Sequence, residues 1–233
     1  MASGKKVLAF DIYGTLLNTG AIARSIQKYV KEIQSEEQAK SLATSWRTYQ
    51  LEYTWRFNSM NIYESFDVVT RKSLLNAAAD MNIPLTAPTV EALMQAYHEL
   101  PSFEDASSSV KHLLSRTDVQ VVLFSNGTDE MVTKSIMAAS LPITLPRYLV
   151  NSVKKYKPSP EVYEGLVQFL GMQDRKTDVW LVSGNPFDIA GARSYGMNTI
   201  WVDRAHNGWH DRLLDVGPTK VVSGLEEITK LEF

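Results

Sequence analysis

Five short runs of mostly β-branched and aliphatic residues determine the fold class of this chain. They cover residues 7–10, 119–124, 179–182, 199–202 and 220–222, and most are apolar on both faces. Strands of this kind occur in parallel sheets that are covered by helices on both sides. Helical patterns separate several runs, at residues 107–115, 129–139, 160–170 and 188–195. The sequence therefore predicts an α/β fold, a doubly wound, Rossmann-like parallel sheet with ligands at the carboxyl ends of its strands.

About a hundred residues between the first two runs contain no comparable apolar run. Apolar residues recur there every three or four positions, as at Ile26, Tyr29 and Ile33, which predicts amphipathic helices at residues 21–38, 41–57, 65–80 and 89–100. A simple crossover between parallel strands needs far fewer residues. We therefore predict a helical cap domain at residues 18–100, inserted into a core of residues 1–17 and 101–233, with a cleft between them.

Composition narrows the classes of function. The chain has 233 residues, with 24 Lys and Arg against 26 Asp and Glu, and no long run of one charge, which argues against a nucleic-acid partner. Cysteine is absent, so disulfides, thiolate metal sites and a cysteine nucleophile are excluded. No segment reaches the roughly 20 apolar residues of a membrane span, nor has the apolar core of a signal peptide. We expect a cytoplasmic small-molecule enzyme without a membrane partner.

Polar residues gather where the predicted strands end. A carboxylate at the tip of a parallel strand, followed by a glycine turn, is well placed to act as a nucleophile, and Asp11 has this position. The polar residues after the later strands each have an ordinary explanation when taken alone: Ser125 and Asn126 as turn residues, Asp188 as a helix N-cap, and Lys157 as a solvated lysine. Together they predict one crevice that holds carboxylate, hydroxyl, amide and ammonium groups: Asp11, Ser125, Asn126, Lys157, Tyr163, Ser183, Asn185 and Asp188.

This set resembles the haloacid dehalogenase superfamily over the whole chain, and more narrowly its L-specific (S)-2-haloacid dehalogenase subgroup. Tyr13 stands where the phosphatases of the superfamily carry a second Asp as general acid, and a departing halide needs no proton. Residues 183–188 lack the paired acids that hold Mg²⁺ in those phosphatases. Residues 45–55 are similar to the cap segment of the subgroup, in which Arg47 would receive the halide.

The resemblance implies hydrolysis of short-chain 2-haloalkanoic acids to 2-hydroxy acids through an ester on Asp11, with inversion at C2. Ser125 would bind the substrate carboxylate, water would cleave the ester, and no metal or cofactor would take part. Thr15 would orient Asp11 and Tyr163 would orient Lys157. The implied catalytic residues are Asp11, Thr15, Arg47, Ser125, Lys157, Tyr163, Ser183, Asn185 and Asp188, and the implied substrate- and halide-binding residues are Tyr13, Arg47, Leu51, Ser125, Asn126 and Phe187.

Two other functions remain open at this point: a Mg²⁺-dependent phosphatase of the same superfamily, and a non-catalytic binding protein that keeps the fold. A homodimer is also open, because the subgroup is often dimeric. The sequence leaves the chain length of the substrate and the preferred halogen undetermined.

Overall fold

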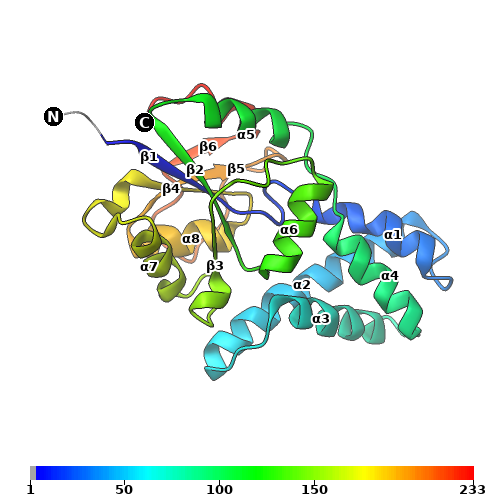
Figure 1. Ribbon diagram of the computed structural model, residues 1–233. Coiled ribbons are helices and arrows are strands. Elements are labelled where there is room, and N and C mark those ends of the chain that lie inside the picture. Colours follow the sequence, from blue (N-terminus) through cyan, green and yellow to red (C-terminus); the bar gives the residue numbers. More distant parts are fainter. Residues whose placement is uncertain (1–3) are drawn as a thin grey trace.

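A six-stranded parallel sheet forms the centre of the molecule in the computed structural model, which describes residues 4–233 (Figure 1). Its strand order is β3-β2-β1-β4-β5-β6. The strands are β1 (Lys6–Phe10), β2 (Val119–Ser125), β3 (Arg147–Leu149), β4 (Val179–Ser183), β5 (Asn198–Val202) and β6 (Lys220–Val222). The predicted α/β fold is therefore confirmed. Because β1 pairs in parallel with both β2 and β4, the residues that follow these three strands lie close together at the carboxyl ends of the strands.

Strand β3 is missing from the sequence prediction. It has three residues, begins with Arg147, and pairs only with β2 at the edge of the sheet. So short a segment carries too little apolar periodicity to be distinguished from a loop. The other five strands match the five predicted runs to within one residue at either end.

Helices cover both faces of the sheet, and Figure 1 shows α5 on one side with α7 and α8 on the other. The core helices are α5 (Ala106–Ser115), α6 (Asp129–Ala138), α7 (Pro160–Phe169), α8 (Pro186–Tyr195) and α9 (Leu225–Ile228). Short 3₁₀ turns occupy Thr19–Ala21, Val150–Ser152 and Gln173–Asp178. Proline begins α7 and α8, which suits a position whose amide has no partner within the helix. Both helices therefore start directly after the loops that carry Lys157 and Asn185.

Four of the five α-helices between β1 and β2 lie together beyond one edge of the core (Figure 1): α1 (Ile22–Tyr29), α2 (Glu36–Met60), α3 (Phe66–Asp80) and α4 (Ala87–His98). The prediction of one helix over residues 21–38 is wrong. The chain leaves α1 after Tyr29, and Ser35 begins α2 with a capping box, in which its hydroxyl accepts from the amide of Gln38. The helix that begins after Ser35 continues through the predicted helix at residues 41–57, so α2 is a single helix of 25 residues.

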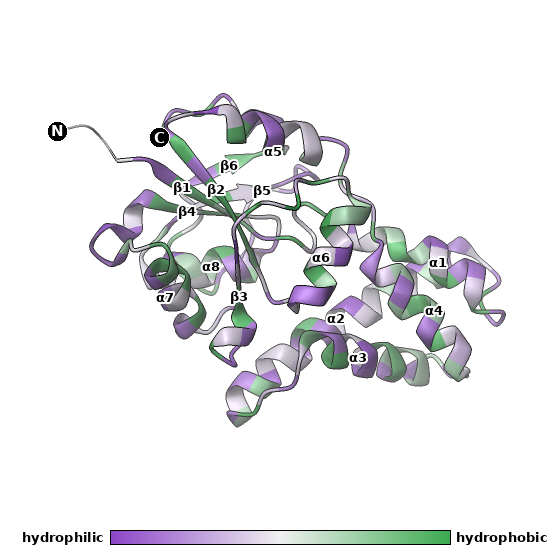
Figure 2. Ribbon diagram, in the orientation of Figure 1, coloured by the Kyte–Doolittle hydropathy of each residue, from purple (hydrophilic) through white to green (hydrophobic). Residues whose placement is uncertain are grey.

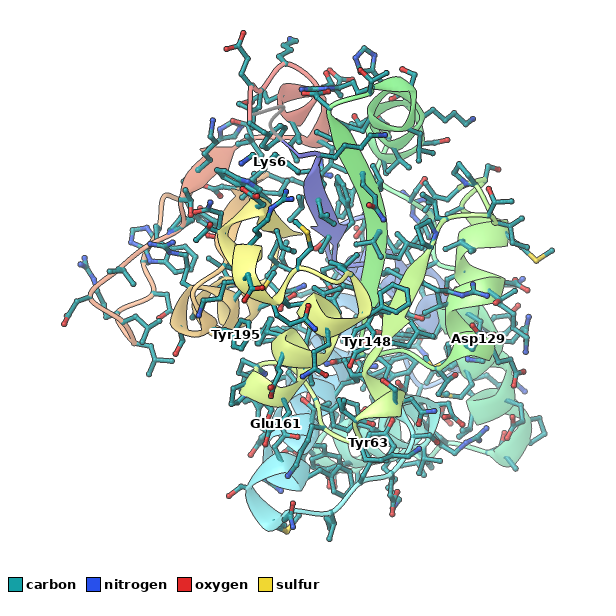
Figure 3. All side chains as sticks on the ribbon, turned by 60° about the vertical axis from the view of Figure 1, so that its left-hand side comes forward. Lys6, Tyr63, Asp129, Tyr148, Glu161 and Tyr195 are labelled. Carbon is teal, nitrogen blue, oxygen red and sulfur yellow. The ribbon has the colours of Figure 1, made fainter. Side chains whose placement is uncertain are left out.

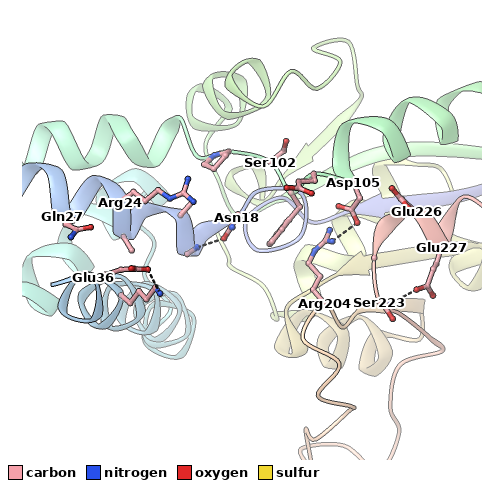
Figure 4. Close-up of a pocket in the computed structure, with 18 of the residues that line it drawn as sticks. Asn18, Arg24, Gln27, Glu36, Ser102, Asp105, Arg204, Ser223, Glu226 and Glu227 are labelled. Carbon is pink, nitrogen blue, oxygen red and sulfur yellow. Dashed lines mark hydrogen bonds and ion pairs between the residues drawn. The ribbon is translucent and has the colours of Figure 1, made fainter.

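Two neighbouring connections join these helices to the sheet. Leu17 forms an isolated antiparallel bridge with Ser102, and the amide of Asn18 donates to the carbonyl of Pro101 at 2.9 Å. Arg204 lies beside them, and Figure 4 shows its ion pair with Asp105, 2.7 Å long. A groove of about 1270 Å³ runs along this region and is lined by charged side chains of both signs.

Apolar residues concentrate in the strands and on the inner faces of the helices, as the colouring in Figure 2 shows. Just after the C-terminal end of α2, Tyr63, labelled in Figure 3, stacks on Tyr156 and donates a hydrogen bond to Asn151 Oδ1 at 3.0 Å.

Within residues 4–233, none of the helices combines the length and the apolar character needed to cross a bilayer.

Candidate active site

Asp11 stands at the carboxyl end of β1 and is 6% exposed. Its Oδ2 accepts hydrogen bonds from Thr15 Oγ1 and Asn185 Nδ2, both at 2.7 Å, and Ser183 Oγ lies 3.5 Å away. The amide of Gly184 in turn donates to Thr15 Oγ1 at 2.9 Å. Donors from the ends of β1 and β4 thus hold this carboxylate in one orientation. The predicted contact between Thr15 and Asp11 is present.

Lys157 supplies a buried cation beside this carboxylate. Only 1% of its side chain is exposed, and Nζ donates to Asp11 Oδ1 at 3.1 Å, Asp188 Oδ2 at 2.8 Å and the Phe124 carbonyl at 2.9 Å. An ammonium has three protons, so these three acceptors saturate it. The ammonium also lies 3.9 Å from the centroid of the Phe124 ring. The Lys157 ammonium therefore lies between two buried carboxylates and compensates the charge of both.

Tyr163 contacts Asp188 rather than Lys157, which corrects the predicted arrangement. Its hydroxyl donates to Asp188 Oδ1 at 2.9 Å, and burial together with the Asp188 carboxylate raises the pKa of the Tyr163 phenol. Burial also raises the pKa of the Asp188 carboxyl, while the Lys157 ammonium opposes that rise. Because α8 begins at Pro186, Asp188 lies in its first turn, between Lys157 and Tyr163. Tyr163 can orient Lys157 only through Asp188.

Arg47 reaches the same site from α2. Its Nη2 donates to Asn185 Oδ1 and to the Tyr13 carbonyl, both at 3.3 Å. Asn185 Nδ2 donates to Asp11 Oδ2 and, at 3.0 Å, to the Tyr13 carbonyl. The amide of Asn185 therefore links the guanidinium to the carboxylate. Gly14, at φ +88°, makes this approach possible, because a Cβ there would lie 3.3 Å from Asn185 Oδ1.

A buried polar network behind Arg47 was not predicted from the sequence. Gln50, fully buried, accepts from Arg47 Nη1 at 2.7 Å and from the Tyr97 hydroxyl at 3.0 Å. Its Nε2 donates to Thr70 Oγ1 at 2.7 Å. The network joins α2, α3 and α4. One signal in the sequence could have found Gln50: it is polar, yet it shares the buried face of α2 with Trp46 and Thr54 at intervals of four.

Tyr13 is buried between the sheet edge and the helices. Its ring lies 5.7 Å from Tyr97 and 5.9 Å from Phe66, measured between ring centroids. Its hydroxyl is 3.4 Å from Ser135 Oγ. Burial raises the pKa of the Tyr13 phenol above its usual value. Tyr13 thus packs against aromatic side chains of α3 and α4, two residues after Asp11.

The remaining predicted residues, Ser125, Asn126, Leu51 and Phe187, contact other groups than the Asp11 carboxylate in the described contacts. Ser125 is fully buried and its Oγ accepts from the amide of Gly127 at 3.1 Å. Asn126 uses its side-chain oxygen to hold the amide of Lys157, at 3.1 Å. Leu51 is half-buried one turn after Arg47. The ring of Phe187 packs edge-on against Trp55, at 5.6 Å between ring centroids.

The described residues, 4–233, contain no group of three or more His, Asp or Glu side chains that could hold a metal ion. The site is instead composed of two carboxylates and two cations, with hydroxyl and amide donors around Asp11. Such a site offers an oriented carboxylate oxygen as a nucleophile and a guanidinium as an anion acceptor.

Known proteins share this architecture and about 30% of the aligned residues. A family model described as haloacid dehalogenase-like hydrolase matches residues 5–196. The (S)-2-haloacid dehalogenase 4A of Burkholderia cepacia is 31% identical over 89% of this chain and 87% of its own length. The (S)-2-haloacid dehalogenase 1 of Pseudomonas sp. strain CBS-3 is 32% identical over 85% of each chain. A crystal structure of a dehalogenase with an intermediate complex aligns at a TM-score of 0.86, with 28% identity over 98% of this chain and 97% of that one.

Proposed function

This chain belongs to the haloacid dehalogenase-like hydrolase family, and from that premise we propose that it hydrolyses the carbon–halide bond of (S)-2-haloalkanoic acids. One observation carries this proposal: Asn185 joins the buried carboxylate of Asp11 to the guanidinium of Arg47. A nucleophile and an anion acceptor thus lie on either side of a single amide. The relatives named (S)-2-haloacid dehalogenase support the same reaction.

In the first step, an oxygen of Asp11 attacks C2 of the substrate and the carbon–halogen bond breaks. The halide leaves with the bonding electron pair toward Arg47, and an ester forms on Asp11 with inversion at C2. The hydrogen bonds from Thr15 and Asn185 hold Asp11 for in-line attack, which lowers the entropic part of the barrier. Ser125 and the amides near it would bind the substrate carboxylate, because they follow the neighbouring strand β2. No proton is needed by the leaving group.

In the second step, water attacks the carbonyl carbon of the Asp11 ester and the 2-hydroxy acid leaves. Lys157 and Ser183 contact Asp11, and Asp188 contacts Lys157; these three residues would position that water. Asp188, the second carboxylate in the site, would accept a proton from the water and return it to the alkoxide oxygen of the 2-hydroxy acid as the bond between that oxygen and the Asp11 carbonyl carbon breaks. Its hydrogen bond from Tyr163 keeps one of its oxygens in place.

We also propose that residues 18–100 act as a cap that brings Arg47 to the core. The paired connections at Leu17 and Ser102 support this boundary, because both lie where the chain leaves and re-enters the sheet domain. Arg47 would then complete the site only when the cap is closed over Asp11.

The experiment compares halide release from (S)-2-chloropropionate by the wild type, by Asp11→Asn, and by Asp118→Asn as a surface control. We expect Asp11→Asn to lose more than about a thousandfold in kcat, while Asp118→Asn retains the wild-type rate. A single turnover in ¹⁸O-water should put the label on Asp11 and leave the first product unlabelled. Label that appears directly in the hydroxy acid would show that water attacks C2. Chelators should leave the rate of halide release unchanged. A Mg²⁺-dependent phosphatase would instead release phosphate from small esters, and a chelator would abolish that activity.

A further inference from the structure

Helix α2 contacts the sheet domain at a second point, beyond Arg47. Asn58 is half-buried in the last turn of this helix. The interval between Arg47 and Asn58 is about three turns at 3.6 residues per turn, so the two residues share one face of α2 and lie about 16 Å apart along its axis. One face of a single helix therefore carries both contacts.

The side-chain amide of Asn58 pairs with the backbone of Tyr156. Its Nδ2 donates to the Tyr156 carbonyl at 2.7 Å, and its Oδ1 accepts from the Tyr156 amide at 2.9 Å. One side chain thus satisfies both the donor and the acceptor of one residue, as the opposite residue does in an antiparallel strand pair. Because hydrogen bonds are directional, the two together fix both the position and the orientation of this backbone.

Lys157 follows Tyr156 directly. Its amide donates to Asn126 Oδ1 at 3.1 Å, so two asparagines hold this short backbone segment, one on α2 and one after β2. From there its Nζ reaches Asp11 Oδ1 at 3.1 Å. The stem of a lysine is flexible, and the anchored backbone sets the point from which the ammonium approaches the carboxylate.

The side chain of Tyr156 is enclosed by the connection between α2 and α3. It is fully buried, its ring stacks on Tyr63 at 5.2 Å between ring centroids, and its hydroxyl donates to the carbonyl of Glu64. Loss of the Asn58 side-chain amide would take from this buried residue the acceptor of its backbone amide. Buried amides without an acceptor are rare, so the backbone should shift to recover one.

We propose that Asn58 is a positioning residue of the reaction, which acts through the Tyr156 backbone on the place where the Lys157 ammonium meets Asp11. This inference rests on the proposed function and gives α2 a second effect on the site. Arg47 receives the halide, whereas Lys157 orients the attacking carboxylate, which is the same for every halogen. Loss of Asn58 should therefore slow the attack for all leaving groups alike.

The test measures halide release in a single turnover at saturating (S)-2-chloropropionate and (S)-2-bromopropionate, together with inhibition by propionate. Asn58→Leu keeps a branched side chain and removes both hydrogen bonds to Tyr156. Asn58→Ala removes the same bonds without the apolar branch, so it reveals any misfit of leucine. Asn61→Gly is the matched control, because it removes the acceptor of Lys155 Nζ, 2.6 Å away, and glycine suits the φ of 55° at this position.

We expect both Asn58 variants to lose about tenfold in the single-turnover rate with either substrate, since a displacement of about 1 Å can cost about a hundredfold and a smaller shift costs less. The inhibition constant of propionate and the ratio of chloride to bromide rates should stay within about twofold of the wild type. Asn61→Gly should keep the wild-type rate, although it also removes a hydrogen bond between α2 and the sheet domain.

Unchanged rates in both Asn58 variants would overturn this role. A loss that is larger for chloride, or that comes with weaker inhibition by propionate, would overturn it too, because either would show that α2 as a whole has moved and has displaced Arg47. An equal loss in Asn61→Gly would have the same meaning. A wild type that releases neither chloride nor bromide would instead refute the proposed function itself.

Discussion

Replacing Gln50 by Leu should weaken the reaction through Arg47, although Gln50 does not reach Asp11. Gln50 Oε1 is the closest acceptor of the Arg47 guanidinium, at 2.7 Å, against 3.3 Å for the Tyr13 carbonyl and Asn185. Leucine has a similar volume and no acceptor. The guanidinium would lose its shortest hydrogen bond and gain freedom to rotate away from the position that the departing halide requires.

The size of the effect follows from the three hydrogen bonds that Gln50 makes. A hydrogen bond to a charged group contributes about 1.5–3 kcal/mol and a neutral one about 1 kcal/mol, and Leu would leave the Tyr97 hydroxyl without its acceptor. We expect the free energy of unfolding to fall by about 2–4 kcal/mol. If about 1–2 kcal/mol of transition-state stabilisation at the halide is lost, kcat falls about five- to thirtyfold.

The assay measures halide release at saturating (S)-2-chloropropionate and (S)-2-bromopropionate, together with urea unfolding. The loss in kcat should be larger for chloride, because the poorer leaving group depends more on Arg47. Thr70→Val is the control, since it removes the partner of Gln50 Nε2 and leaves the acceptor of Arg47 intact. It should lower the free energy of unfolding with less than about a twofold change in kcat. Gln50→Glu keeps an oxygen for Arg47 and should retain most of the activity.

A particular pattern would refute this reasoning. If Gln50→Leu is destabilised while its kcat and its ratio of chloride to bromide rates match those of the wild type, Arg47 does not depend on Gln50 for its position. If Thr70→Val lowers kcat as much as Gln50→Leu does, the effect comes from general loosening of α2 against α3.

Three further predictions concern charge and backbone. Lys157→Met leaves the carboxylates of Asp11 and Asp188 buried without a cation, so urea titration should show a loss of about 3–5 kcal/mol; a loss below about 1 kcal/mol would contradict this. Gly14→Ala introduces a Cβ at φ +88° and should cost about 1–2 kcal/mol with a fall in kcat measured by halide release, as Asn185 is displaced; an unchanged kcat would argue against that displacement. Burial raises the pKa of four tyrosines whose side chains lie in the core, so their phenols ionise more readily in the unfolded chain. Their stabilising contribution is therefore present below the ordinary tyrosine pKa of 10.0 and is lost above it, by about 1.4 kcal/mol per pH unit for each. Denaturant titrations should detect this loss, and ultraviolet absorbance should show these phenols ionising only on unfolding; ionisation of all tyrosines before unfolding would contradict it. The four are Tyr13, Tyr97, Tyr156 and Tyr163.

Much of the fold is predictable because it depends on local pattern. The apolar runs that become β1, β2, β4 and β5 are buried on both sides, and runs of this kind are recognisable without knowledge of their neighbours. The break between α1 and α2 was missed because Val30 and Ile33 keep the apolar spacing of a helix although the chain there is irregular. Periodicity reports which side chains are buried, and a turn can bury the same side chains.

By itself, the sequence determined the sheet and the positions of Asp11, Ser125 and Ser183 at the ends of three neighbouring strands, because strand ends of a parallel sheet converge by geometry. Only the tertiary structure decided which groups touch. Tyr163 bonds Asp188 rather than Lys157, and Gln50 holds Arg47 between three helices. Such contacts depend on the distances and angles between packed elements, and no local pattern of hydropathy specifies them.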